Sequence, residues 1–377
     1  MSSSAVAIPL VDVRAGHAEI ADAVREGFER VLDSSIFVLG PEVSAFEEEF
    51  ARFVGCRCCI AVSNGTDALE LALRAAGVGA GDEVLVPVNT FVATALAVVR
   101  AGAKPVFVDC ESEHLLIDER AIEPLLTPRT KAIIPVHLYG QMTAMGPILE
   151  VADGRGLHVI EDFAQAQGAR QGSRAAGAIG SLGATSFYPA KNLGAYGDAG
   201  AVVTSDPDLA ESLRGLRNHG GTRKHHHPRA GFNCRMDALQ AVVLRAKLKL
   251  LAGWNALRRD AAGRYDRLLR DLAPARAVAR LPGNEHVYHL YVLKLEGRSI
   301  DRDRIVQRFH ESGIEAAIHY PTPLHLTGAF SGLGYRRGDF PVAEKVAGRI
   351  LSLPIFPQIT ADQQERVVAC LRRTLSS

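Results

Sequence analysis

Short apolar runs alternate with longer helical patterns between about residues 60 and 205 of this 377-residue chain. Such alternation is typical of β-α-β units, and it predicts an α/β fold with a mostly parallel sheet flanked by helices. The segments that begin at Thr66 and Phe91 have nearly continuous apolar or alanine faces, as expected for helices packed on a sheet. The runs that we expect to form strands are residues 83–87, 105–109, 131–136, 157–161, 184–188 and 200–204.

The pattern changes after Asp206, where the chain becomes more helical and more basic. A polar, glycine-containing segment from Arg217 is too irregular for a long helix, so we expect a loop there. A long helical stretch begins at Met236 and crosses toward the C-terminal part, which combines a strand-like run from His286 with helices around 301–312 and 341–350. Because the chain is longer than one core usually grows, we predict a large domain over residues 1–255 and a small α+β domain over 256–377.

Composition is ordinary for a globular enzyme, with 47% hydrophobic residues, 23% charged residues and a formal net charge of +1. This balance does not favour nucleic acid or an anionic membrane as a partner. The first residues, MSSSAVAIPL, lack a basic region followed by an apolar core, and no run approaches the roughly 18 apolar residues that span a bilayer. We therefore expect a cytoplasmic protein.

Three of the six cysteines, Cys56, Cys58 and Cys59, lie close together. Six cysteines in a chain of this size do not form a disulfide scaffold. A zinc site would need two spaced pairs of ligands, whereas β-branched and apolar residues follow this cluster directly. We expect the cluster to enter a buried strand and to bind no metal.

Several polar segments fall at the ends of the predicted strands, where ligands bind in parallel α/β sheets. Gly65 and Thr66 begin a predicted helix, whose free N–H groups could bind a phosphate or could simply be capped. Asp162 ends an apolar strand, and its carboxylate either meets a cation or a donor there or caps the following turn. Gln165, three residues further on, could reach the same ligand as a neutral partner.

Lys191 lies between an apolar run and a glycine-rich turn in SFYPAKNLGAYGDAGAVV. A lysine that is partly removed from water has a lowered pKa and can act as a nucleophile, although an ordinary surface position is the alternative. Ser186 could contact the same phosphate as Thr66, and Phe91 could stack on a flat ring or pack in the core. Together these are the parts that pyridoxal 5'-phosphate (PLP) requires, so we predict that Lys191 binds PLP as an imine and transfers the proton of a transamination.

At this point the motifs are recognisable. The chain resembles the PLP-dependent sugar aminotransferases of the DegT/StrS type, fold-type I enzymes that aminate nucleotide-linked keto sugars. The resemblance covers nearly the whole length, and its motifs include SNGTDALELAL, VPVNTFVATA, VIEDFAQAQGA, SFYPAKNLGAYGDAGAVVT, GFNCRMDALQA and IHYPTPLHL. It implies a fold-type I architecture and transamination with L-glutamate as the amino donor.

The resemblance also implies roles for individual residues in cofactor binding. Lys191 would form the covalent link, Asp162 would pair with the pyridine nitrogen, and Gln165 would approach the ring hydroxyl. Asn233 would reach the phosphate in the neighbouring subunit, which implies a homodimer with two shared sites. The residues that would hold the phosphate or stack on the ring are Gly65, Thr66, Ser186 and Phe91.

On the substrate side, the resemblance implies that His319 lines the sugar pocket and that Tyr188 borders the substrate. The loop RNHGGTRKHHHPRAG would meet the nucleotide diphosphate through Arg223 and Lys224 with the histidines at 225–227, although a solvated loop is an equal alternative. The motifs look more like those of enzymes that aminate C-3 of a dTDP-3-keto-6-deoxyhexose than of those that aminate C-4. The loop histidines depart from this pattern, because the C-3 group tends to carry tyrosine there.

Three other classes of protein are alternatives to this hypothesis. A dehydratase on the same scaffold would have histidine in place of Lys191. A non-catalytic relative would be expected to lose Lys191, Asp162 or the phosphate-binding residues, and all of them are present. A metalloprotein built on the cysteine and histidine clusters would contain zinc. We expect a sugar aminotransferase, with C-3 amination favoured and C-4 amination as the alternative.

Overall fold

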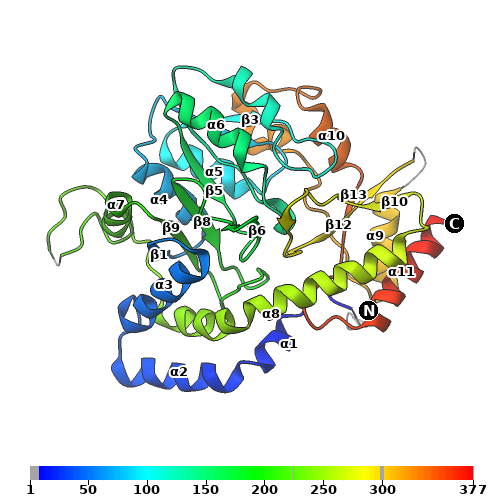
Figure 1. The fold of residues 1–377 in the computed structure, drawn as a ribbon, viewed down its shortest axis with the longest axis horizontal. Helices are drawn as coiled ribbons and strands as arrows, with labels where there is room; N and C mark the ends of the chain where they lie inside the picture. The colour runs from blue at the N-terminus through cyan, green and yellow to red at the C-terminus, as the bar shows by residue number, and fades with distance from the viewer. Residues whose placement is uncertain (1–7, 224, 298–300, 377) are drawn as a thin grey trace.

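The fold is built around a seven-stranded sheet with the strand order β1-β9-β8-β5-β4-β2-β3 (Figure 1). The computed structural model describes residues 8–223, 225–297 and 301–376, so Lys224 lies outside the described residues. The strands are β1 (Cys58–Val62), β2 (Glu83–Pro87), β3 (Lys104–Val108), β4 (Thr130–Ile133), β5 (His158–Asp162), β8 (Leu182–Ser186) and β9 (Gly200–Thr204). Only β9 runs antiparallel to its neighbours, which confirms the predicted mostly parallel sheet.

Helices cover both faces of this sheet because successive side chains of a strand point to opposite faces. In β2, Val84 and Val86 pack into a core shared with α4 (Gly65–Ala75), α5 (Val92–Ala101) and α7 (Pro207–Arg217). Leu85 packs on the other side with α6 (Met145–Arg155). The helices α3 (Gly40–Val54) and α8 (Ala238–Leu269) cover that second face near β1 and β9.

The cysteine cluster leads into the sheet as predicted, with Cys59 buried in β1. Burial raises the pKa of the Cys56 thiol to about 11, so this thiol is protonated at neutral pH. Among the residues that the structure describes, no group of three or more His, Cys, Asp or Glu side chains is placed to hold a metal ion.

The C-terminal part has its own antiparallel sheet, with the order β10 (Ala275–Ala277), β12 (Tyr291–Leu295) and β13 (Ile350–Leu353). Two expectations need correction here. The run from His286 becomes a regular strand only at Tyr291, because the N–H groups of Val287 and Leu290 bond to the turn at 139–140. The helix expected over 341–350 ends at Ala347, and β13 then begins as a fully buried apolar strand.

Helix α8 is 32 residues long and passes through the predicted domain boundary at 255 without a break. Its first half packs in the core of the large sheet as far as Leu251, and its second half packs from Ala261 onward with the small sheet. The change of core thus falls near the predicted boundary, although the chain has no linker there. The division into two domains stays a prediction.

The remaining helices and short strands complete the surface. The N-terminal helices α1 and α2 lie below the sheet in the view of Figure 1, and α2 packs against α8. Their bounds and those of the other elements are α1 (Val13–Ala18), α2 (Ala21–Ser34), α9 (Arg302–Glu311), α10 (Pro341–Ala347), α11 (Ala361–Leu375), β6 (Arg170–Gln171), β7 (Arg174–Ala175) and β11 (Asn284–Glu285). Short 3-10 helices are η1 (Glu119–Ala121), η2 (Glu123–Leu125), η3 (Leu138–Gly140), η4 (Leu324–Leu326) and η5 (Gly328–Leu333).

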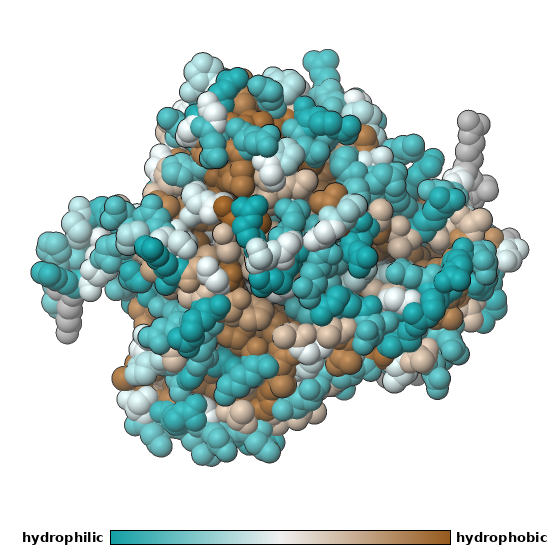
Figure 2. All heavy atoms as spheres, viewed as in Figure 1, coloured by the Kyte–Doolittle hydropathy of each residue, from teal (hydrophilic) through white to brown (hydrophobic). Residues whose placement is uncertain are grey.

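The visible surface is mostly hydrophilic, with apolar colour showing between α2 and α8 (Figure 2). Within the described parts of the chain, no helix combines the length and the apolar character needed to traverse a bilayer.

Candidate active site

A cavity of about 720 Å³ lies at the carboxyl ends of β5 and β8. This is the edge of an open α/β sheet where ligands bind, because strand ends and helix N-termini converge there. The predicted site residues that line this cavity are Gly65, Thr66, Phe91, Asp162, Gln165, Ser186, Tyr188, Lys191 and His319. Segments separated by more than two hundred residues therefore meet in one site.

One end of the cavity is formed by the start of α4 and the end of β8. Asn64 caps the helix, since its side chain accepts a hydrogen bond from the N–H of Asp67. The cap is therefore formed by Asn64, and the hydroxyl of Thr66 is not needed for it. A Cβ atom on Gly65 would lie 2.5 Å from Cβ of Ser186, which means that only glycine allows this close approach. The first N–H groups of α4 have no partner within the helix, so they and the Ser186 hydroxyl are suited to one phosphate.

Asp162 is the last residue of β5, and its two carboxylate oxygens are held by different elements. Oδ2 accepts a hydrogen bond from Thr94 Oγ1 of α5 at 2.9 Å, and Oδ1 accepts one from the N–H of Ala164 at 3.2 Å. The bond from Ala164 is the one expected if Asp162 caps the following turn. The bond from Thr94 fixes the carboxylate at the cavity. Burial raises the pKa of Asp162, and the two hydrogen bonds and the charge of Lys191 oppose that rise. A cation at this position would further favour the ionised carboxylate.

Lys191 follows β8 in a turn, where its N–H bonds to the carbonyl of Tyr188. Burial lowers the pKa of the Lys191 amine to about 8, and the nearby charge of Asp162 acts in the opposite direction. A larger fraction of this amine is therefore neutral near physiological pH than for a lysine in water, which favours nucleophilic use. Lys191 thus has the exposure to a cavity and the lowered pKa that the sequence predicted.

Gln165 is held between two tyrosines that the sequence did not single out. Its Oε1 accepts a hydrogen bond from the N–H of Tyr139 at 2.7 Å, and its Nε2 donates to the hydroxyl of Tyr320 at 3.0 Å. The Tyr139 hydroxyl donates to the backbone carbonyl of His319 at 2.6 Å. These bonds fix the amide orientation and leave one N–H of Gln165 for a ligand.

Two histidines at the cavity are uncharged at neutral pH. Burial lowers the pKa of His319 to about 4, and its Nδ1 lies 2.8 Å from Oγ of Ser352. Burial also lowers the pKa of His289 well below its usual value, and its Nδ1 lies 3.3 Å from Oδ1 of Asn192. Asn192 donates its amide hydrogens to Asn255 and to the backbone, so its oxygen must accept from His289. Nε2 of His289, a residue that lines the cavity, is therefore left as an acceptor.

His289 was missed in the sequence, as were Thr94, Tyr139 and Tyr320. A signal existed for Tyr320, which adjoins His319 in the IHYP motif, and for Thr94, because the buried Asp162 required a donor. No local signal marked Tyr139 or His289, since Tyr139 bonds to His319, 180 positions away, and His289 bonds to Asn192, 97 positions away.

The aromatic residues Phe91 and Tyr188 stand at the cavity with exposed fractions of 53% and 56%. Phe91 is therefore not a core residue, and its ring lies 5.7 Å from that of Tyr320 at an angle of 37°. Both side chains have apolar surface free to contact a ligand or another subunit.

Two predicted site residues lie outside this cavity in the single chain. Arg223 and Asn233 are exposed, and Asn233 forms an isolated bridge with Asn218. Lys224 lies outside the described residues. The histidines at 225–227 are exposed on the loop that follows α7 and projects from the molecule (Figure 1).

Residues 18–372 match the sequence profile of the DegT/DnrJ/EryC1/StrS aminotransferase family. The chain belongs to this family. A dTDP-3-amino-3,4,6-trideoxy-α-D-glucose transaminase of Streptomyces venezuelae is 43% identical over 97% of this chain and 95% of the relative. A UDP-N-acetyl-3-dehydro-α-D-glucosamine 3-aminotransferase of Acidithiobacillus ferrooxidans is 46% identical over 98% of both chains.

Solved structures agree with this assignment. The crystal structure of DesV from S. venezuelae, in complex with a ketimine intermediate, superposes with a TM-score of 0.94 at 43% identity and covers 97% of this aminotransferase and 98% of DesV. NtdA from Bacillus subtilis, solved with bound cofactor PMP, gives a TM-score of 0.88 at 32% identity, over 98% of this chain and 83% of NtdA. The predicted fold class, sugar aminotransferase activity and PLP cofactor are thereby confirmed.

The residues present in this aminotransferase fit PLP. The close approach of Gly65 to Ser186 provides donors for a phosphate, Asp162 offers a fixed carboxylate, and Lys191 offers an amine of low pKa. All four residues line one cavity large enough for a cofactor together with a substrate.

Proposed function

We propose that this protein transfers an amino group from L-glutamate to C-3 of a dTDP-linked 3-keto-deoxyhexose. The observation that carries the proposal is the meeting of Lys191, Asp162 and the start of α4 in one cavity. The choice of C-3 is supported by relatives that are named 3-amino sugar transaminases, including one of Aneurinibacillus thermoaerophilus at 40% identity. These names favour C-3 amination over the alternative of C-4 amination.

Each residue of the cavity has a part in holding the cofactor. Gly65, Thr66 and Ser186 would bind its phosphate through N–H and O–H donors, which fix its position. Asp162 would keep the pyridine nitrogen protonated, because a buried carboxylate stabilises a neighbouring positive charge. Bound PLP would supply the electron sink for the charge that develops at the amino-bearing carbon.

Lys191 would first hold the cofactor covalently and would then, once displaced by the amino substrate, move the proton. Its amine has a pKa of about 8, so it can both accept and return a proton near neutral pH. Neutral His289 can accept a hydrogen bond at the same cavity without adding a second positive charge beside Lys191. Phe91 would stack on the cofactor ring, while Tyr188 and His319 would border the sugar.

The remaining parts of the proposal concern the whole protein. We place it in the cytoplasm as a homodimer in which Asn233 reaches the phosphate of the neighbouring subunit. Arg223 and Lys224 would contact the diphosphate of the nucleotide sugar. The exposed positions of Arg223 and Asn233 are compatible with contacts made outside their own chain's cavity.

The test supplies PLP, isotopically labelled L-glutamate and either a dTDP-3-keto or a dTDP-4-keto 6-deoxyhexose, and NMR then locates nitrogen in the product. We expect nitrogen at C-3 and no product with Lys191→Ala, which should remain folded. A UDP-linked 3-keto sugar is the matched comparison, because the A. ferrooxidans relative is named for such a substrate. Nitrogen at C-4, or a faster reaction with the UDP sugar, would contradict the proposed substrate.

A further inference from the structure

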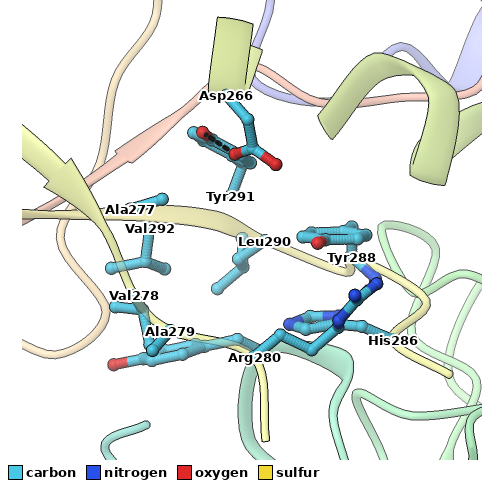
Figure 3. Close-up of a pocket in the computed structure, with 11 residues that line it drawn as sticks. Asp266, Ala277, Val278, Ala279, Arg280, His286, Tyr288, Leu290, Tyr291 and Val292 are labelled. Atoms are coloured by element: carbon cyan, nitrogen blue, oxygen red, sulfur yellow. Dashed lines mark hydrogen bonds between the residues drawn. The ribbon is translucent and has the colours of Figure 1, made fainter. Parts of the chain in front are cut away.

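A second pocket of about 290 Å³ lies between the C-terminal half of α8, the small sheet and the turn at Tyr139 (Figure 3). It shares no lining residue with the active-site cavity. Its apolar lining includes Ala277, Val278, Leu290 and Val292, and its polar lining includes Asp266, Arg280, His286 and Tyr288. None of these polar residues has a role in the reaction described above.

His286 offers a hydrogen-bond donor to this pocket from a buried position, with 6% of the residue exposed. Its ring stacks on that of Tyr288, with centroids 3.9 Å apart and an angle of 10° between the planes. Nδ1 accepts a hydrogen bond from the backbone N–H of Tyr288 at 2.9 Å, so the proton of the neutral ring is on Nε2. Burial and the charge of Arg280 lower the pKa of His286 to about 3, which keeps the ring neutral. Within the described chain, Nε2–H has no hydrogen-bond partner.

Arg280 adds a positive charge at the same end of the pocket, where its side chain extends toward His286 and Tyr288. It is exposed and forms no ion pair with any described residue. Two further cations near Tyr288 already have partners. Arg259 is paired with Glu285 at 3.0 Å, and Arg258 donates to the carbonyls of Tyr288 and Ile355. Arg280 and His286 together are therefore suited to an anion, and a guanidinium binds a carboxylate through two N–H groups.

The opposite side of the pocket carries a negative charge. Asp266 of α8 accepts a hydrogen bond from the Tyr291 hydroxyl at 2.7 Å, and Figure 3 places this pair across the pocket from Arg280 and His286. Asp266 is exposed and forms no salt bridge with a described residue, so its carboxylate can accept from a ligand. The pocket thus has an anion-binding end, an apolar middle and a cation-binding end.

We propose that this pocket binds a small linear ω-amino acid, with its carboxylate on Arg280 and His286 and its ammonium group on Asp266. The methylene chain lies on Val278, Leu290 and Val292. Because each non-hydrogen atom takes roughly the 30 Å³ of a water molecule, the volume admits on the order of ten such atoms. This size suits 6-aminohexanoate.

Two segments connect the pocket to the active site. Tyr288 and Leu290 line the pocket, whereas His289 between them lines the active-site cavity. Tyr139 lines the pocket and also bonds to Gln165 and to the carbonyl of His319. A ligand that holds these segments is therefore placed to alter the surroundings of Lys191.

The experiment is calorimetric titration of the PLP-loaded enzyme with 6-aminohexanoate, hexanoate and hexylamine. The variants are Arg280→Leu and Asp266→Asn. The matched control is Arg276→Leu, because Arg276 is an exposed arginine in β10 and is not among the residues that line the pocket. We expect 6-aminohexanoate to bind the wild type and the control alike, and both pocket variants to bind at least about tenfold more weakly. Hexanoate and hexylamine, which each lack one charge, should also bind at least about tenfold more weakly.

Two results would overturn the proposal. One is an absence of binding to the wild type. The other is binding that is unchanged in both pocket variants, because the compound would then occupy the active-site cavity. The second readout is the visible absorbance of the cofactor, which 6-aminohexanoate should shift in the wild type and the control but not in Arg280→Leu. An equal shift in Arg280→Leu would count against the pocket in the same way.

Discussion

At the scale of single residues, a lowered pKa does not by itself make a lysine reactive. Burial lowers the pKa of both Lys191 and Lys247 to about 8. Lys247 donates to the carbonyl of Gly194 at 2.6 Å and is not among the cavity residues, whereas Lys191 lines the cavity. What separates the two amines is access to a ligand, and this difference gives an internal control for any test of Lys191.

The capture of PLP by the protein freed of cofactor should depend on pH through Lys191. Only the neutral amine attacks an aldehyde, and lowering its pKa to about 8 means that the proton is lost as the pH rises through about 8. The rate of imine formation should therefore rise with pH, reach half its plateau near pH 8 and level off above it. Stopped-flow absorbance measures the rate, and borohydride reduction with peptide mapping identifies the modified lysine.

We expect the modification on Lys191, none on Lys247, and no imine absorbance in Lys191→Ala. A midpoint near the usual lysine value of 10.5 would show that burial does not perturb this amine in solution.

At the scale of elements, the sequence predicted six strands of the seven-stranded sheet by their residues, because fully buried strands give continuous apolar runs. It predicted the seventh, β1, only as a buried strand that the cysteine cluster enters. It did not predict β13, since Ile350–Leu353 is too short to distinguish from the end of the preceding helix. The strand ends also carried the chemistry that could be predicted, as for Asp162 and Ser186. Tyr139 could not be predicted, because its role comes from a turn with φ of 63° that contacts residues far away in sequence.

Replacing Gly65 by alanine should weaken cofactor binding by separating α4 from β8. The new Cβ would lie 2.5 Å from Cβ of Ser186, and overpacking of this kind costs about 1 to 3 kcal/mol. We expect the Kd for PLP to rise about tenfold or more, as measured by equilibrium titration of the protein freed of cofactor.

Gly253→Ala is the matched control, because Gly253 is exposed in α8 and has open space around its Cβ position. It should bind PLP normally and gain up to about 1 kcal/mol in the free energy of unfolding. Unchanged PLP affinity in Gly65→Ala would show that the two elements can separate without cost.

At the scale of the whole molecule, one chain does not account for all the predicted site residues. Asn233 is exposed and outside the cavity, and Phe91 and Tyr188 expose apolar rings at its edge. Further apolar side chains are exposed at the end of α2 and after it, namely Leu32, Ile36, Phe37 and Val38. A second copy of the chain would cover such surface and could supply Asn233.

Mixing two inactive variants tests this sharing of sites. If Asn233 acts on the neighbouring subunit, then Lys191→Ala and Asn233→Ala homodimers are each strongly impaired. Their heterodimers regain one complete site out of two, and random exchange makes about half of the dimers mixed, so about one quarter of the wild-type activity should return. Activity is measured after denaturation and joint refolding, with separately refolded variants as the control. No recovery would indicate that Asn233 serves its own chain.

Helix α8 has a consequence for cooperativity. Its 32 residues form one rod of about 48 Å whose two halves are packed in different apolar clusters. If either cluster loses its packing, the other loses the support of the same backbone, because no flexible linker separates them. We therefore expect the two ends of the molecule to unfold in one transition. A cavity made in the C-terminal cluster should also loosen the turn that contains Lys191, because Asn192 of that turn bonds to Asn255 of α8.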